Sequence, residues 1–132
     1  MIDNRLSQLQ SCYTSVIHDV MREMGLRNFT FPHRITPLQP EKVLCGPAWT
    51  VEGRVDETAD PHKTLLAWTG LLSKAKSGHI YTVQPNTHQI AQMGELSAET
   101  LQNKGILGCV WLVDLTITLL FEILWYSKTL PL

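Results

Sequence analysis

Apolar residues recur at helical spacing near the start of the chain. Over residues 6–24 they return about every three to four positions, and Gly25 stands where a glycine commonly ends a helix. Thr14 or Ser15 could cap this helix, which would leave the residues before it as a lead-in or a separate turn. Residues 27–39 contain two prolines among mixed polar residues, which predicts an irregular connection.

From about residue 46 the chain alternates strand patterns with helix patterns. Gly46-Pro47 interrupts the first apolar run, which favours a bulged or edge strand. The continuous apolar run after Gly105 is typical of a strand buried on both faces. The strand–helix–strand order predicts a right-handed crossover, a parallel strand pair and an α/β fold. The predicted elements are strands over 48–52, 79–83 and 106–113, a helix from Asp60-Pro61 to Gly78, and a helix from Gln89 or Gly94 to Lys104.

The composition predicts a single globular domain, residues 1–132, in a reducing cytosol. The net charge is −1 and the basic residues form no run, which argues against a direct RNA or DNA binder. The three cysteines, Cys12, Cys45 and Cys109, are too widely spaced for a zinc site or a disulfide framework, and each is predicted to be buried. The polar N-terminus has no secretory signal pattern, and we expect a cytoplasmic protein.

Chemistry is expected where strands lead into helices, because open α/β sheets bind ligands at the carboxyl ends of their strands. The unpaired N–H groups at the start of the third predicted helix could hold a carboxylate or phosphate, and Gly94 would permit close approach. Glu95 could act there as a general base or position a water. From spacing alone, an acid that only complements the helix dipole is the favoured explanation of Glu95. Asn86, His88 and Gln89 could line the site or simply form a polar loop.

Four segments with distinctive sequences follow one another at plausible spacing: TSVIHDVMREMG at 14–25, GPAWTV at 46–51, HKTLLAW at 62–68 and MGELSAE at 93–99. Over about residues 14–108 the chain therefore resembles the RraA-like family, that of the regulator of ribonuclease E activity A. Other members are metal-dependent aldolases for 4-hydroxy-4-methyl-2-oxoglutarate and 4-carboxy-4-hydroxy-2-oxoadipate. Many relatives carry the label demethylmenaquinone methyltransferase, which nothing here supports, because no glycine-rich nucleotide loop follows a strand.

The resemblance implies a swivelling β/β/α domain that forms homotrimers or hexamers with sites between subunits. In such aldolases Mg²⁺ or Mn²⁺ binds a small 2-oxo acid and stabilises the enolate of pyruvate. Backbone amides matching Leu96 and Ser97, after Gly94, would hold the substrate carboxylate. The acid matching Glu95 would orient a metal-bound water, and this favours a site role for Glu95. The implied activity is aldol cleavage or oxaloacetate decarboxylation. The alternative is a non-catalytic oligomeric binding protein, like the ribonuclease regulator.

The second half of the family site has no convincing counterpart in this chain. The resemblance implies a Gly-x-x-Arg-Asp motif after the last predicted strand, where the arginine would grip the carboxylate and the aspartate would hold the metal. Here no arginine follows Lys104, and Asp114, a weak metal candidate, is followed by Leu115 instead of glycine. We therefore expect aldolase activity to be absent or severely reduced.

Residues 109–132 are a divergent hydrophobic tail, so the family domain is expected to be incomplete at its C-terminus. If residues 106–125 spanned a membrane, the apolar residues would lower the free energy of insertion, and Asp114 and Glu122 would raise it by nearly the same amount. A buried strand followed by an amphipathic or irregular segment is therefore favoured over a membrane anchor. A frameshifted or alternatively terminated product would also explain the abrupt end of the resemblance.

Overall fold

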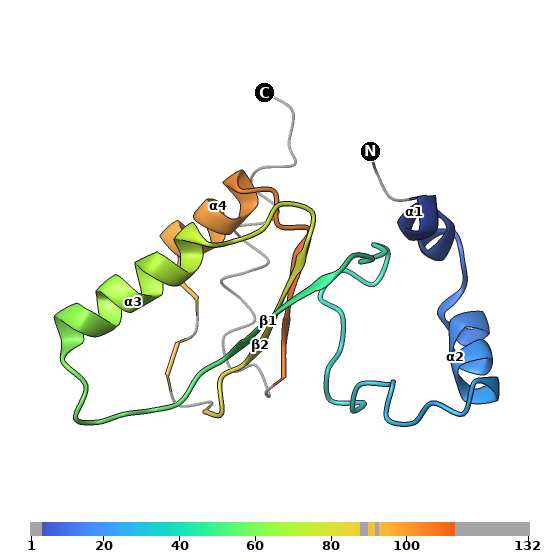
Figure 1. Ribbon diagram of the computed structural model, residues 1–132, viewed down its shortest axis with the longest axis horizontal. Coiled ribbons are helices and arrows are strands. Elements are labelled where there is room, and N and C mark those ends of the chain that lie inside the picture. The colour runs from blue at the N-terminus through green and yellow to red at the C-terminus, as the bar shows by residue number, and fades with distance from the viewer. Residues whose placement is uncertain (1–3, 88–89, 92, 113–132) are drawn as a thin grey trace. The chain divides into compact units, whose positions relative to one another are not determined.

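The protein is described by a computed structural model that covers residues 4–87, 90–91 and 93–112. By internal contacts the chain divides into two compact units, Met1–Cys45 and Gly46–Leu132. Among the described residues, the first unit contains two short helices, and the second contains three strands and two helices (Figure 1). The prediction of a single domain over residues 1–132 stays a prediction.

The second helix of the first unit, α2 (Thr14–Glu23), ends as the sequence predicts. Gly25 has a φ of +76°. Its N–H donates to the Arg22 carbonyl at 3.0 Å, and the Leu26 N–H donates to the Met21 carbonyl at 3.1 Å. These two bonds form a Schellman motif, in which glycine adopts the left-handed conformation without a steric penalty.

The start of α2 differs from the prediction. Thr14 is the first residue inside the helix, and Tyr13 is the N-cap residue, with no side-chain hydrogen bond to the helix end. Capping by Thr14 or Ser15 is therefore wrong, because both residues lie beyond the cap position. The preceding segment forms a separate helix, α1 (Asn4–Gln10). Residues 27–39 contain neither helix nor strand, which confirms the predicted irregular connection.

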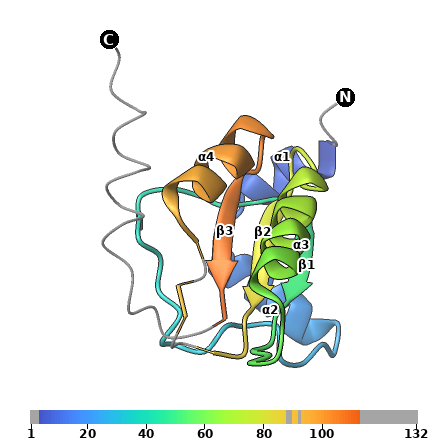
Figure 2. The same ribbon diagram turned by 90° about the vertical axis from the view of Figure 1, so that its left-hand side faces the viewer.

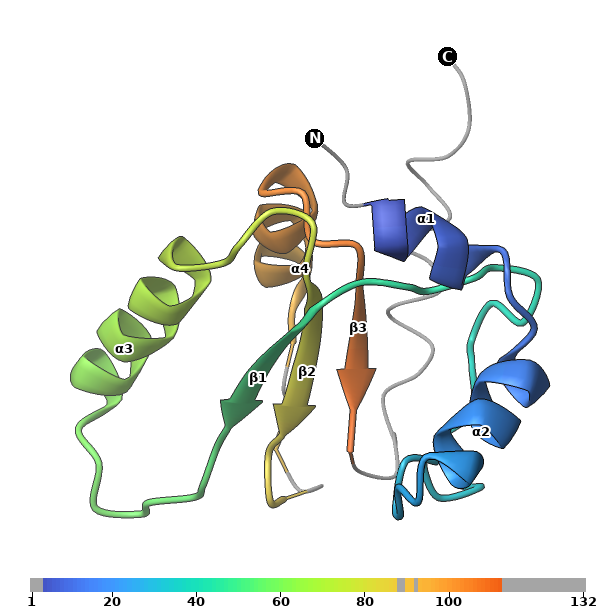
Figure 3. The ribbon, with the colours of Figure 1, turned by 45° about the vertical axis from the view of Figure 1, so that its right-hand side comes forward.

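The second unit is built on a parallel sheet of three strands, β1 (Ala48–Glu52), β2 (Ile80–Gln84) and β3 (Gly108–Trp111). The strand order is β1-β2-β3, and Figure 3 shows the strands side by side. β1 pairs with β2 along its full length, and β2 pairs with β3. The predicted α/β fold and the parallel pairing are confirmed, and β1 is an edge strand of the described sheet.

Two helices connect the strands, α3 (Pro61–Ser73) between β1 and β2, and α4 (Glu95–Asn103) between β2 and β3. Figures 1 and 2 show both helices on the same face of the sheet. The start of α3 is confirmed: the Asp60 carboxylate accepts a hydrogen bond from the Lys63 N–H at 2.8 Å, and proline occupies the first turn.

Two predictions about this unit are wrong. Gly78 does not end α3, because the helix stops at Ser73. Gly78, with a φ of +73°, lies instead in a turn that leads into β2. Among the described residues, the strand predicted over 106–113 is shorter and is not buried on both faces: Trp111, at 7% exposure, is the one buried residue of β3, and Leu107, just before the strand, is 44% exposed. The physical reason is that the helices cover one face of the sheet, so only alternate strand residues are enclosed.

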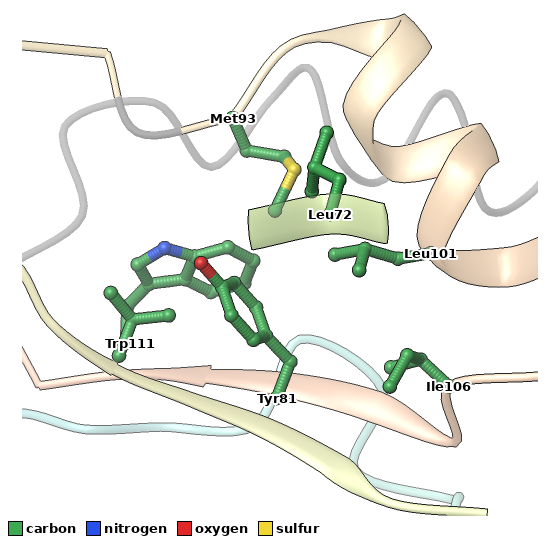
Figure 4. Packing of buried hydrophobic residues seen from close by; sticks show 7 residues of the cluster. Leu72, Tyr81, Met93, Leu101, Ile106 and Trp111 are labelled. Carbon is green, nitrogen blue, oxygen red and sulfur yellow. The ribbon is translucent and has the colours of Figure 1, made fainter. Parts of the chain in front are cut away.

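The core of this unit lies between the sheet and the two helices. Tyr81 is 1% exposed, and its hydroxyl has no hydrogen-bond partner among the described residues. Burial, with a smaller contribution from Cys109, raises the pKa of Tyr81 to about 12. Figure 4 shows how the side chains of the core lie; they are Leu72, Tyr81, Val83, Met93, Leu101, Ile106 and Trp111.

The cysteines follow the prediction only in part. All three are free. Cys109 packs against the core, and burial raises the pKa of its thiol to about 12, whereas Cys12 is exposed. The expectation that Cys12 is buried is therefore wrong, because it follows the short helix α1 at the surface of the first unit. Among the described residues no helix is both long and apolar enough to span a membrane.

Candidate functional site

The candidate site lies at the carboxyl edge of the parallel sheet. β2 ends at Gln84 and α4 begins at Glu95, so the connecting residues and the first turn of α4 follow the carboxyl end of a strand. Open α/β sheets bind ligands at this edge, because the following helices start there with unpaired N–H groups.

The starts of the two helices in this unit differ in one respect. The first turn of α3 is capped by the side chain of its N-cap residue, Asp60. The N-cap of α4 is Gly94, and no side chain of the described residues caps the helix. Its first helical hydrogen bond runs from the Ala98 N–H to the Gly94 carbonyl at 3.0 Å, and no described residue accepts a hydrogen bond from the preceding amides of the first turn. Partial positive charge at this end favours an anion.

Gly94 leaves this helix end open. Its φ of −114° is available to any residue, and a Cβ built on it would meet no atom within 4 Å. Neither conformation nor crowding therefore requires glycine in the described chain. The next residues also face outward, since Glu95 is exposed and Leu96 is 81% exposed. Apart from its two chain neighbours, no described residue therefore crowds the position of a Cβ on Gly94 at the helix start.

Ser97 has a partner that the sequence did not reveal. The indole Nε1–H of Trp68, in α3, donates a hydrogen bond to Ser97 Oγ at 3.0 Å. A second bond joins the C-terminal ends of the two helices, from Lys104 Nζ to the Ser73 carbonyl at 2.9 Å. The available signal was the place of Trp68 on the apolar face of the predicted helix, which indicated burial but not this contact.

Asn86 connects the carboxyl ends of β1 and β2 through hydrogen bonds. Its Nδ2 donates to Glu52 Oε1 at 3.1 Å and to the Gly53 carbonyl at 2.9 Å, and its Oδ1 accepts from Gln84 Nε2 at 2.9 Å. Asn86 also has a positive φ of +56°, which asparagine tolerates better than most residues. Because its side-chain amide already bonds these groups, Asn86 shapes the edge of the sheet. The other two polar residues predicted to line the site, His88 and Gln89, lie outside the described residues.

No metal centre forms among the described residues. They contain no group of three or more histidine, cysteine, aspartate or glutamate side chains that could hold an ion. Asp114, the weak metal candidate, lies outside the described residues. Glu95 is therefore an isolated carboxylate beside the helix start in this part of the chain, and its catalytic role stays a prediction.

Comparison with known families decides the classification. The model of the RraA-like family, described as Aldolase/RraA, matches residues 14–112. The chain belongs to the RraA-like family. This confirms the resemblance over residues 14–108 and extends it through β3. Neither the comparison with curated proteins nor the one with solved structures found a match. The description of the RraA-like family names both an aldolase and a regulator, so membership alone does not choose between the two functions.

Proposed function

We propose that this RraA-like protein binds small 2-oxo acids through their carboxylate at the start of α4. The observation that carries the proposal is the first turn of this helix, which no described side chain caps, in contrast to the capped start of α3. The amides of Leu96 and Ser97 would donate to the carboxylate oxygens, and Gly94 leaves the approach free. The helix dipole and two charge-assisted hydrogen bonds support a Kd on the order of 1 mM.

Glu95 would lie beside the bound 2-oxo group. There it could take or hold a proton at the carbon next to the carbonyl, or position a water. The family expectation of Mg²⁺ or Mn²⁺ would add a Lewis acid for the enolate. The described residues do not fit a metal by themselves, since no three-ligand group occurs among them, and no step of the proposal passes through one. With Leu115 in place of the glycine of the Val-Asp-Gly step expected before the motif, and no arginine after Lys104, we expect binding with little or no turnover.

Binding is tested by titrating the full chain with pyruvate and following the backbone amide signals of Leu96 and Ser97 by NMR. Pyruvamide, which has the same size but no carboxylate, is the control ligand. We expect both signals to move with pyruvate only, and less at high salt, because screening weakens the attraction. Equal shifts with pyruvamide, or shifts confined to other residues, would refute the carboxylate site.

Turnover is measured as pyruvate released from oxaloacetate with Mg²⁺ or Mn²⁺, against Glu95→Gln as the matched variant. A rate close to that of the uncatalysed reaction is expected for both proteins. If the parent is clearly faster and Glu95→Gln abolishes the difference, the protein is a lyase, and the expectation of little turnover is wrong.

A second candidate function is the non-catalytic, oligomeric one. It is favoured by an exposed apolar stripe at helical spacing along α2: Tyr13 at 80%, Val16 at 51%, Val20 at 50% and Met24 at 69% exposure. A homotrimer or hexamer, measured as solution mass, is the expected state. Val20→Glu should lower that mass, and Glu23→Gln, on the same helix, should leave it unchanged. A monomeric parent chain would remove the support for this candidate. The cytoplasmic location stays a prediction.

A further inference from the structure

We propose that Trp68 is a positioning residue of the carboxylate site. Its indole N–H donates a hydrogen bond to Ser97 Oγ at 3.0 Å. In this arrangement the Ser97 hydroxyl donates its own hydrogen to the bound anion. This inference rests on the proposed function, and it adds a side-chain donor to the two backbone amides. Trp68 lies in α3 and does not need to touch the ligand, because it acts through Ser97.

The other serine and threonine hydroxyls of α3 and α4 show what Ser97 does differently. A helical hydroxyl commonly donates to a backbone carbonyl three or four residues earlier. Four of them do so here: Thr64 to Asp60, Thr69 to Leu66, Ser73 to Thr69 and Thr100 to Leu96, at 2.7 to 3.0 Å. Ser97 donates to no atom of the described residues, and its oxygen accepts from Trp68 instead.

The chemistry of the two groups fixes the direction of the bond. An indole N–H can only donate, so Ser97 Oγ must be the acceptor, and no described residue accepts the hydrogen of the Ser97 hydroxyl. Ser97 is the third residue of α4, in the same uncapped turn as the amide of Leu96. A hydroxyl that accepts one bond while donating another is polarised, which strengthens the bond it donates.

The test uses the full chain with pyruvate as the probe. Trp68→Phe keeps an aromatic ring and removes the N–H, and Ser97→Ala removes the hydroxyl. Thr100→Ala is the matched control, because it deletes a hydroxyl of the same helix that already bonds the Leu96 carbonyl. Lys104→Met removes the other bond between α3 and α4, and it separates loss of helix packing from loss of positioning.

Each of Trp68→Phe and Ser97→Ala should raise the Kd for pyruvate about 3- to 10-fold, as loss of one hydrogen bond predicts. The double variant should be no weaker than either single variant, because both act through one hydroxyl. Thr100→Ala and Lys104→Met should keep the parent Kd. The indole N–H signal of Trp68, which is identified by its absence in Trp68→Phe, should shift when pyruvate binds, and a purely structural bond would not produce that shift.

The inference is overturned if Trp68→Phe binds pyruvate like the parent, if the two substitutions multiply in the double variant, or if Lys104→Met weakens binding as much. If Trp68→Phe does not fold, Trp68→Leu, which also removes the indole N–H, takes its place against the same Thr100→Ala control. Failure of the proposed function looks different: the parent chain then binds no pyruvate and the Leu96 and Ser97 amides do not move, which overturns both proposals together.

Discussion

Replacing Tyr81 with phenylalanine should stabilise the protein. The ring of Tyr81 is 1% exposed and lies 5.1 Å from that of Trp49, centre to centre. The hydroxyl has no hydrogen-bond partner among the described residues, so none of them compensates for its removal from water on folding. An unsatisfied buried hydroxyl costs about 1–3 kcal/mol. Tyr81→Phe retains the packing of the ring and removes this penalty, so the free energy of unfolding should rise by about that amount.

The same burial gives a pH dependence with a definite sign. The pKa of Tyr81 is raised from 10.0 to about 12 in the folded protein, so folding favours the neutral phenol. The resulting contribution to the free energy of unfolding is fully present below pH 10 and is lost as the pH rises toward 12. The total loss is up to about 2–3 kcal/mol. Cys109, with a pKa raised from 9.0 to about 12, adds a separate loss that begins near pH 9. Tyr81→Phe should lack the first loss and keep the second.

Urea unfolding at pH 7 and pH 10.5, followed by circular dichroism, measures both effects. With a slope of about 1–2 kcal/mol per molar urea, the midpoint of Tyr81→Phe should rise by about 1 M at pH 7. Tyr13→Phe is the matched control, because the Tyr13 side chain is 80% exposed and its hydroxyl stays in water. A Tyr81→Phe protein less stable than the parent would refute the reasoning, since the hydroxyl must then have a partner such as a buried water.

Substitutions at three further positions test the connections around the sheet. Asp60→Ala should lower the free energy of unfolding by about 0.5–2 kcal/mol in urea unfolding, because the Lys63 N–H loses its cap. Asn86→Ala should lower the free energy of unfolding by about 1–3 kcal/mol, because the side-chain hydrogen bonds are lost. Asn86→Gly loses the same bonds but should lower it less, since glycine accepts the φ of +56° without strain. Equal losses for the two variants would show that backbone strain is unimportant at this position. Gly94→Asp should cap α4 and raise the free energy of unfolding by a few tenths to about 1 kcal/mol. The same substitution should abolish pyruvate binding in the NMR titration, because the new carboxylate occupies the helix start. Unchanged binding would contradict the placement of the pyruvate carboxylate.

Local chemistry explains which parts of the fold could be predicted from the sequence. The start of α3 is set by Asp60 and its bond to the Lys63 N–H, three residues away. The ends of α2 and α4 are set by Gly25 and Gly105, both with positive φ and both followed by bonds back into the last turn. In each case the residues that carry the signal are those that make the contact. Such features can be read before any tertiary structure is known.

The predictions that were wrong depend on contacts between distant residues. Gly78 carries the same signal as Gly25, but its N–H donates to the Gly105 carbonyl at 2.8 Å, which places it in a turn beside the other crossover. The apolar run before Trp111 does not reveal that helices cover only one face of the sheet. The Trp68–Ser97 bond joins residues 29 positions apart, and it exists only because α3 and α4 pack on the same face.

The candidate site depends on how α4 is held. A helix of nine residues is too short to be stable alone, and no described side chain caps the start of this one. Its stability must therefore come from its later residues and from α3: Leu101 is 2% exposed in the core, Lys104 bonds the end of α3, and Trp68 holds the first turn. A cap at Gly94 would stabilise the helix directly, but it would occupy the N–H groups that a ligand needs. Because neighbouring elements fix α4 in place, its first turn can remain open for a carboxylate.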